Sequence, residues 1–129
     1  MKELEKLIEL VAYKHEIDMK RADKKYMDTD WIAQSIVDEV DEVKEEIRPN
    51  NRAYLEDELS DILWGWLTLV EKLKSSGYVE SHNSIIIRGL KKYEERILPL
   101  TGDKRDCTIW REVKEKQKKV LEIEQQALN

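Results

Sequence analysis

The chain has 129 residues, of which 40% are charged and 40% hydrophobic, with four glycines, two prolines and no phenylalanine. This length fits one domain with a buried core, and this composition favours helices and argues against disorder. With 23 basic and 28 acidic residues the net charge is −5, which excludes a general attraction for nucleic acid or an anionic membrane. The single cysteine excludes a disulfide framework and a cysteine-based zinc site. No apolar run approaches a membrane span of about 18 residues and the first residues do not resemble a signal peptide, so the cytoplasm is the expected location.

Apolar residues recur at helical spacing almost throughout the chain, and this periodicity predicts five helices. They are expected at residues 3–26, 31–47, 53–75, 84–97 and 108–127. Asp28 or Asp30 is the expected N-cap of the second helix, and Gly77 is expected to close the third. Short connections between long helices make neighbours antiparallel. The sequence therefore predicts an all-α fold, an antiparallel bundle of four to five helices in a single domain at 1–129.

Two acidic clusters stand on the second and third predicted helices. In DEVDEVKEE, residues 38–46, Glu39 and Glu42 lie one turn apart on one flank of the apolar stripe. In EDELSDILW, residues 56–64, Glu58 and Asp61 have the same offset from their own stripe. The two stripes expected to face the core are Ile36, Val40, Val43 and Ile47 on the second helix, and Leu55, Leu59, Ile62, Leu63, Trp66, Val70 and Leu73 on the third.

Antiparallel packing of these two helices is expected to bring the two carboxylate pairs together across a groove. Four such groups repel one another unless they are protonated or bridged by a cation, and an all-oxygen cluster suits Mg²⁺ or Mn²⁺. A single ExxE motif is common in an acidic chain as a solvated helix face. The paired placement, with Lys44 as the one cation within the clusters, favours a metal site. Gly65, one turn beyond Asp61, is expected to leave room beside the metal or for a ligand.

This pattern resembles the MazG-like all-α nucleoside triphosphate pyrophosphohydrolases, whose signature is ExxE, a spacer and ExxD. Here the signature stands as E-V-D-E at 39–42, fifteen residues, and E-L-S-D at 58–61. The segment KYEER at 92–96 is similar to the family's K-x-x-R-R segment, and WREVK at 110–114 to its W-x-x-I/V-K run. Ser60 replaces the usual glycine, and no P-W-D-x-x-Q-T segment precedes the first acidic helix. The resemblance covers about residues 30–118.

The resemblance implies Mg²⁺-dependent hydrolysis of a nucleoside or deoxynucleoside triphosphate between its α and β phosphates, giving monophosphate and pyrophosphate. It implies four metal-binding and catalytic residues, Glu39, Glu42, Glu58 and Asp61. Lys92 and Arg96, one turn apart, are expected to bind the phosphates, with Lys91 and Arg88 as weaker candidates. Trp64 is expected at a subunit interface or against the base. Members of the family assemble, so a homodimer or homotetramer is expected.

Other readings stay open at this stage. Phosphoribosyl-ATP pyrophosphohydrolase and dimeric deoxyuridine triphosphatase use a related scaffold, and a non-catalytic helical interaction module would keep the acidic surface for solubility. A ferritin-like di-iron bundle requires Glu-x-x-His on two helices, and neither His15 nor His82 stands three residues after a glutamate. His15 lies on an apolar stripe and is expected to be a hydrogen-bonded core residue.

Overall fold

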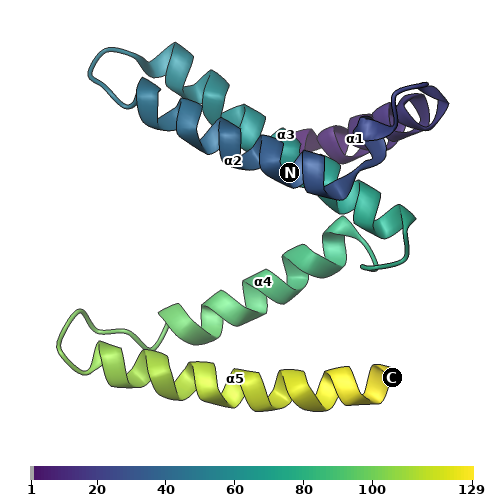
Figure 1. Ribbon diagram of the computed structural model, residues 1–129. Coiled ribbons are helices and arrows are strands. Elements are labelled where there is room, and N and C mark those ends of the chain that lie inside the picture. The colour runs from purple at the N-terminus through teal and green to yellow at the C-terminus, as the bar shows by residue number, and fades with distance from the viewer. Residues whose placement is uncertain (1) are drawn as a thin grey trace. The chain divides into compact units, whose positions relative to one another are not determined.

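The computed structural model describes residues 2–129 and is all-α over that range, with no strand among these residues (Figure 1). The elements are α1 (Lys2–Lys20), the 3-10 helix η1 (Lys24–Met27), α2 (Thr29–Glu46), α3 (Arg52–Ser75), α4 (His82–Ile97) and α5 (Asp106–Leu128). The all-α prediction with five α-helices is confirmed. None of these helices, within the described chain, has a stretch apolar and long enough to span a bilayer.

The chain divides into two compact units, Met1–His82 and Asn83–Asn129. The first, unit 1, contains α1, η1, α2 and α3, and the second, unit 2, contains α4 and α5 except for His82. The prediction of a single domain stays a prediction.

Local sequence sets the ends of α2 and α3. The Asp28 side chain accepts a hydrogen bond from the Asp30 backbone N–H, which confirms Asp28 as the N-cap of α2. Gly77 has a φ of +82°, and the N–H groups of Gly77 and Tyr78 donate to the carbonyls of Lys74 and Leu73. This pattern is a Schellman motif, in which a left-handed glycine closes the helix. The expected role of Gly77 is therefore confirmed.

The first helix is shorter than predicted. It ends at Lys20, and the Arg21 N–H turns back to the Asp18 carbonyl. Asp23 then caps η1, because its side chain accepts a hydrogen bond from the Lys25 N–H. The predicted end at residue 26 was wrong because an aspartate that caps a new turn competes with continuation of the helix.

The core of unit 1 lies where α3 packs between α1 and α2. Its fully buried side chains include Leu67, which is 0% exposed, and Val11, which is 2% exposed. The other buried apolar residues are Ile32, Val43 and Val70. Several residues expected in the inward stripes are instead exposed, namely Val40, Ile47, Leu59 and Leu63.

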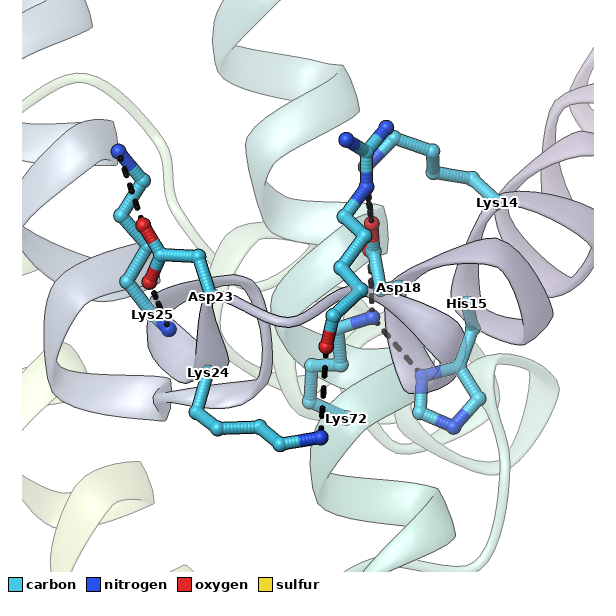
Figure 2. A network of polar contacts seen from close by, with 8 residues as sticks. Lys14, His15, Asp18, Asp23, Lys24, Lys25 and Lys72 are labelled. Carbon is cyan, nitrogen blue, oxygen red and sulfur yellow. Dashed lines mark hydrogen bonds and ion pairs between the residues drawn. The ribbon is translucent and has the colours of Figure 1, made fainter.

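A buried ionic network joins α1 to α3 (Figure 2). The Lys72 ammonium donates to Asp18 Oδ2 at 2.8 Å, and Lys14 and Arg21 donate to the other oxygen of the same carboxylate. Lys72 and Asp18 have side chains that are 2% exposed. Burial would raise the pKa of Asp18, but hydrogen bonds from Lys14 and Lys72 outweigh it and lower that pKa.

His15 belongs to the same network, as expected of a core histidine. Lys72 Nζ lies 2.8 Å from His15 Nδ1, and Ser75 Oγ lies 3.0 Å from Nε2. Because an ammonium group only donates, we assign the proton of the neutral ring to Nε2, which donates to Ser75. Removal from water, followed by the Lys72 charge, lowers the pKa of His15, in agreement with a neutral ring. In this tautomer His15 cannot act as a base toward Ser75.

Unit 2 is a hairpin of α4 and α5. The Arg88 guanidinium pairs with the Glu124 carboxylate, and Arg96 Nε donates to Gln117 Oε1 at 2.8 Å. Gln117 also donates to the Lys92 carbonyl at 3.0 Å. At the turn, the Asp106 carboxylate accepts hydrogen bonds from the N–H groups of Thr101 and Gly102, which fixes the start of α5.

Candidate active site

The α2–α3 hairpin brings together the carboxylates that the sequence singled out. One oxygen from each of Glu39, Glu58 and Asp61 lies within 4.8 Å of the others. Glu42 lies close enough for its charge to act on both Glu39 and Glu58. These four residues, named here the carboxylate cluster, come from facing positions of two antiparallel helices. The turn between them is short, so its length fixes which residues face one another.

Part of the cluster is withdrawn from water. Oε2 of Glu39 and Oε2 of Glu58 are inaccessible to solvent and have no hydrogen-bond partner. Loss of water, the hydrogen bond with Glu42 and the charges of Glu42, Asp61 and Glu58 raise the pKa of Glu39 to about 7. Desolvation, followed by the charge of Glu42, also raises the pKa of Glu58. The cluster therefore holds more negative charge than its own hydrogen bonds stabilise.

Basic residues of the described chain do not compensate this charge. No ion pair within residues 2–129 involves Glu39, Glu42, Glu58 or Asp61. Lys44, the nearest basic residue in sequence, lies 4.0 Å from Asp41 on the solvent side of α2.

Glu46, one turn beyond Glu42, differs from the members of the cluster. Its carboxylate accepts from Asn51 Nδ2 at 2.6 Å and from Arg48 at 3.4 Å, and its backbone carbonyl accepts from the same Asn51 amide at 2.8 Å. These contacts hold Glu46 at the α2–α3 turn.

The cluster fits a divalent cation. Its donors are all carboxylate oxygens, which hard ions such as Mg²⁺ and Mn²⁺ prefer over nitrogen or sulfur. The two orphaned oxygens, Glu39 Oε2 and Glu58 Oε2, are the groups that a cation would satisfy. Proximity, lack of basic partners and orphaned oxygens together separate this cluster from an ordinary solvated acidic face.

Gly65 does not leave an open space next to the cluster. A Cβ built at Gly65 would lie 2.8 Å from Cγ1 of Ile36, and its three nearest heavy atoms all belong to Ile36. The expectation of room for a metal or ligand at this glycine was therefore wrong. Close packing of α2 against α3 fills that space.

The predicted phosphate-binding residues lie on unit 2. Lys92, Arg96, Lys91 and Arg88 all line one groove between α4 and α5, together with Trp110. The Arg96 guanidinium lies over the rings of Tyr93 and Trp110, at 5.7 and 5.5 Å from their centroids. Trp64, the predicted base or interface residue, is half-buried on α3 in unit 1.

Sequence reasoning missed the supporting residues. Neither the role of Asn51, which holds Glu46, nor the network of Asp18 and Lys72 was predicted from the sequence. A signal existed for the network, because Lys14, Asp18 and Arg21 are spaced to meet on one helix face. That spacing gives no indication of Lys72, which is 54 residues away from Asp18.

The fold and the carboxylate cluster define a class: an all-α protein with an oxygen-rich site between two antiparallel helices. The family model of the MazG nucleotide pyrophosphohydrolase domain matches residues 28–97, just over half of the chain. The chain belongs to this family. The match contains the whole carboxylate cluster and all four predicted phosphate-binding residues, and it ends before Trp110. No curated protein and no solved structure matches the chain significantly.

Proposed function

We propose that the protein hydrolyses a nucleoside triphosphate, or its deoxy form, at the α–β phosphoanhydride, releasing a nucleoside monophosphate and pyrophosphate. The cofactor proposed is Mg²⁺, with Mn²⁺ as a substitute. The observation that carries the proposal is the carboxylate cluster, with its two orphaned buried oxygens, inside a MazG nucleotide pyrophosphohydrolase domain.

In this proposal the carboxylate cluster has two tasks. Glu39, Glu42, Glu58 and Asp61 hold the metal through their oxygens, and one of the four orients the attacking water by accepting its hydrogen bond. The bound cation supplies neutralisation of phosphate charge and a more acidic water. Because α2 and α3 are rigid elements joined by a short turn, these carboxylates need little rearrangement before substrate binds.

We further propose that Lys92 and Arg96 bind phosphate oxygens of the substrate, with Lys91 and Arg88 as additional contacts. Their shared groove supports this role. Arg96 is held against two aromatic rings, so its position is fixed before an anion arrives. Arg88 would have to exchange the Glu124 carboxylate for phosphate, which makes it the weaker of the two arginines as a binding group.

A homodimer or homotetramer in the cytoplasm is the proposed state of the enzyme. Apolar side chains that the described structure leaves exposed on α5, Val120, Leu121 and Ile123, support assembly. Light scattering after size-exclusion chromatography tests it, and a monomer at micromolar concentration would contradict it.

A panel of ribo- and deoxynucleoside triphosphates with Mg²⁺, assayed separately for pyrophosphate and orthophosphate, tests the activity. Pyrophosphate is the expected primary product, and orthophosphate as primary product would overturn α–β cleavage. Glu58→Gln is expected to lower turnover by roughly 10²–10³-fold, the usual effect of removing one electrostatic contact to the reacting groups. Asp41→Asn is the matched control, because Asp41 lies on the same hairpin but is exposed on the solvent side and paired with Lys44.

The same panel separates the remaining alternatives. Phosphoribosyl-ATP and deoxyuridine triphosphate belong in it, because a strong preference for either would assign the chain to a related-scaffold enzyme. A non-catalytic interaction module would hydrolyse none of these substrates. It would also leave the cluster without a role, which its two orphaned oxygens argue against.

A further inference from the structure

We propose that Gly65 is a positioning residue, which sets the separation of α2 and α3 and thereby the spacing of the carboxylate cluster. This inference rests on the proposed metal-dependent function and deepens it. Gly65 follows Asp61 by four residues, and Ile36 precedes Glu39 by three. Because α2 and α3 run antiparallel, the contact of Ile36 with Gly65 lies one turn from the pair Glu39 and Asp61.

The contact is too close for any side chain at residue 65. A Cβ there would meet Ile36 Cγ1 at 2.8 Å, whereas carbon atoms in contact lie about 3.5–4.0 Å apart. Accommodation of a methyl group therefore requires a movement of roughly 1 Å. The atom in the way is not a flexible chain end. It is the first branch of a β-branched residue, whose χ1 angle is strongly restricted within a helix.

The easier response is separation of the two helices. Ile36 and Gly65 both lie within helices, and Ile36 is half-buried, so relief of the contact by Ile36 alone requires a change of its restricted χ1 angle. A wedge at this level moves Glu39 on α2 away from Glu58 and Asp61 on α3.

The cluster is sensitive to such a movement. Oxygens of Glu39, Glu58 and Asp61 now lie within 4.8 Å of one another. Ligands of one Mg²⁺ lie about 2.0–2.1 Å from the ion, so they are at most about 4.2 Å apart. A further separation of roughly 1 Å leaves Glu39 unable to share an ion with the other two without rearrangement.

Helix propensity alone gives the opposite expectation for this glycine. Glycine is less favourable than alanine within a helix, so Gly65→Ala should stabilise α3 if no contact were at stake. Gly89 provides the matched comparison, because it also lies inside a helix and a Cβ there would meet nothing within 4 Å. The two substitutions are chemically identical and differ in the contact with Ile36.

The experiment is Mn²⁺ binding, measured by electron paramagnetic resonance on four proteins: the natural chain, Gly65→Ala, Gly89→Ala and the double variant Ile36→Ala with Gly65→Ala. Circular dichroism without metal first establishes that each is folded. Gly65→Ala is expected to weaken Mn²⁺ binding by roughly 10- to 100-fold, the usual effect of disturbing the support of metal ligands. Gly89→Ala should bind like the natural chain, and the double variant should recover most of the affinity because the wedge is gone.

A folded Gly65→Ala protein with natural Mn²⁺ affinity would overturn this inference and leave the proposed function intact. If Gly65→Ala does not fold, the double variant decides: recovered binding supports the inference, and weak binding by a folded double variant overturns it. A natural chain that binds Mn²⁺ but releases no pyrophosphate would overturn the proposed function alone. A natural chain that binds no Mn²⁺ would overturn both.

Discussion

Unit 1 contains two groups of carboxylates that are at least partly removed from water. The two groups differ in how their negative charge is stabilised. At the junction of α1 with α3, one carboxylate, Asp18, is shared by three basic residues, Lys14, Arg21 and Lys72 (Figure 2). At the junction of α2 with α3, four carboxylates meet with no basic residue paired to them in the described chain. The pKa of Asp18 is lowered, whereas the pKa of Glu39 is raised to about 7.

This difference shows which junction is complete without a ligand. Both oxygens of the buried Asp18 carboxylate have basic donors, so the contribution of this network is structural, the attachment of α1 to α3. The carboxylate cluster balances its charge only by taking up protons or a cation. The family match agrees with this division, because it begins at residue 28, after Asp18, and includes the whole cluster.

The largest expected effect comes from removing a basic residue from the complete junction. Lys72→Met should lower the free energy of unfolding by about 3 kcal/mol, because Asp18 Oδ2 and His15 Nδ1 both lose their buried donor, although Lys14 and Arg21 keep Asp18 Oδ1 paired. Urea unfolding measures this. The matched control is Lys74→Met on the same helix. The Lys74 side chain is 47% exposed and its ammonium lies 4.0 Å from Glu71, so the effect should be below about 0.5 kcal/mol.

A double variant, Asp18→Asn with Lys72→Met, sharpens the same point. It removes both buried charges and should recover much of the loss, since Asp18→Asn removes the charge of the carboxylate whose Oδ2 has lost its donor. Equal stability of Lys72→Met and Lys74→Met would show that the network does not hold α1 in place.

Addition of metal should act at the other junction alone. Mn²⁺ at about 100 times its dissociation constant is expected to raise the free energy of unfolding by about 2.7 kcal/mol, and a chelator should reverse the gain. Lys72→Met should show the same metal-induced increase, starting from a lower free energy of unfolding, whereas Glu58→Gln should show no increase. An increment that survives in Glu58→Gln would place the ion elsewhere.

The two junctions also predict opposite pH dependence without metal. The pKa of Glu39 is about 7 in the folded chain against an ordinary 4.5, so the folded state binds this proton more tightly. Stability from Glu39 is therefore full at low pH and is lost as pH rises from about 5 to 8. After allowance for solvent screening, the loss should be about 1–2 kcal/mol.

Comparison with Glu39→Gln isolates this effect, because glutamine does not titrate. The lowered pKa values of His15 and Asp18 act in the other direction, since each withdraws stability as pH falls. The contributions of His15 and Asp18 are the same in both proteins, so they cancel in the difference between the two free energies of unfolding. Chelated samples at pH 5 and pH 8 suffice, and parallel stability curves for the two proteins would contradict the raised pKa of Glu39.

Much of this arrangement was predictable because it depends on neighbours in sequence. The last four helices begin and end within two residues of their predicted bounds. The meeting of Glu39 with Glu58 and Asp61 follows from one short turn and from equal offsets beside two apolar stripes. The overlong first helix shows the limit of periodicity, because the cap at Asp23 interrupts a pattern that otherwise continues.

Features that depend on the distance between helices were not predictable. Periodicity gives the face of α3 that is buried but not that Lys72 meets Asp18 across 54 residues of chain. The wrong interpretation of Gly65 has the same cause. A glycine beside acidic residues is compatible with a ligand space or with close packing, and only the position of Ile36 decides between them.

Glu46 gives the smallest and most selective test of the comparison, because it lies one turn beyond Glu42 and yet is built like Asp18, with donors of its own. Asn51 is the N-cap residue of α3, but its side chain makes no capping hydrogen bond and instead donates to Glu46. Asn51→Ala should therefore cost about 1 kcal/mol through Glu46, and Asn51→Asp should cost more because it replaces the donor with a second negative charge.

Neither change at Asn51 should alter Mn²⁺ affinity strongly, and Glu46→Gln should bind Mn²⁺ like the natural chain. The reason is that the hydrogen bonds of Glu46 already stabilise its charge, so it gains little from an ion that the unpartnered oxygens of Glu39 and Glu58 attract more strongly. A loss of affinity in Glu46→Gln as large as that in Glu58→Gln would move Glu46 into the metal site. A hydrogen-bond donor from the protein would then no longer distinguish a structural carboxylate of α2 from a metal-binding one.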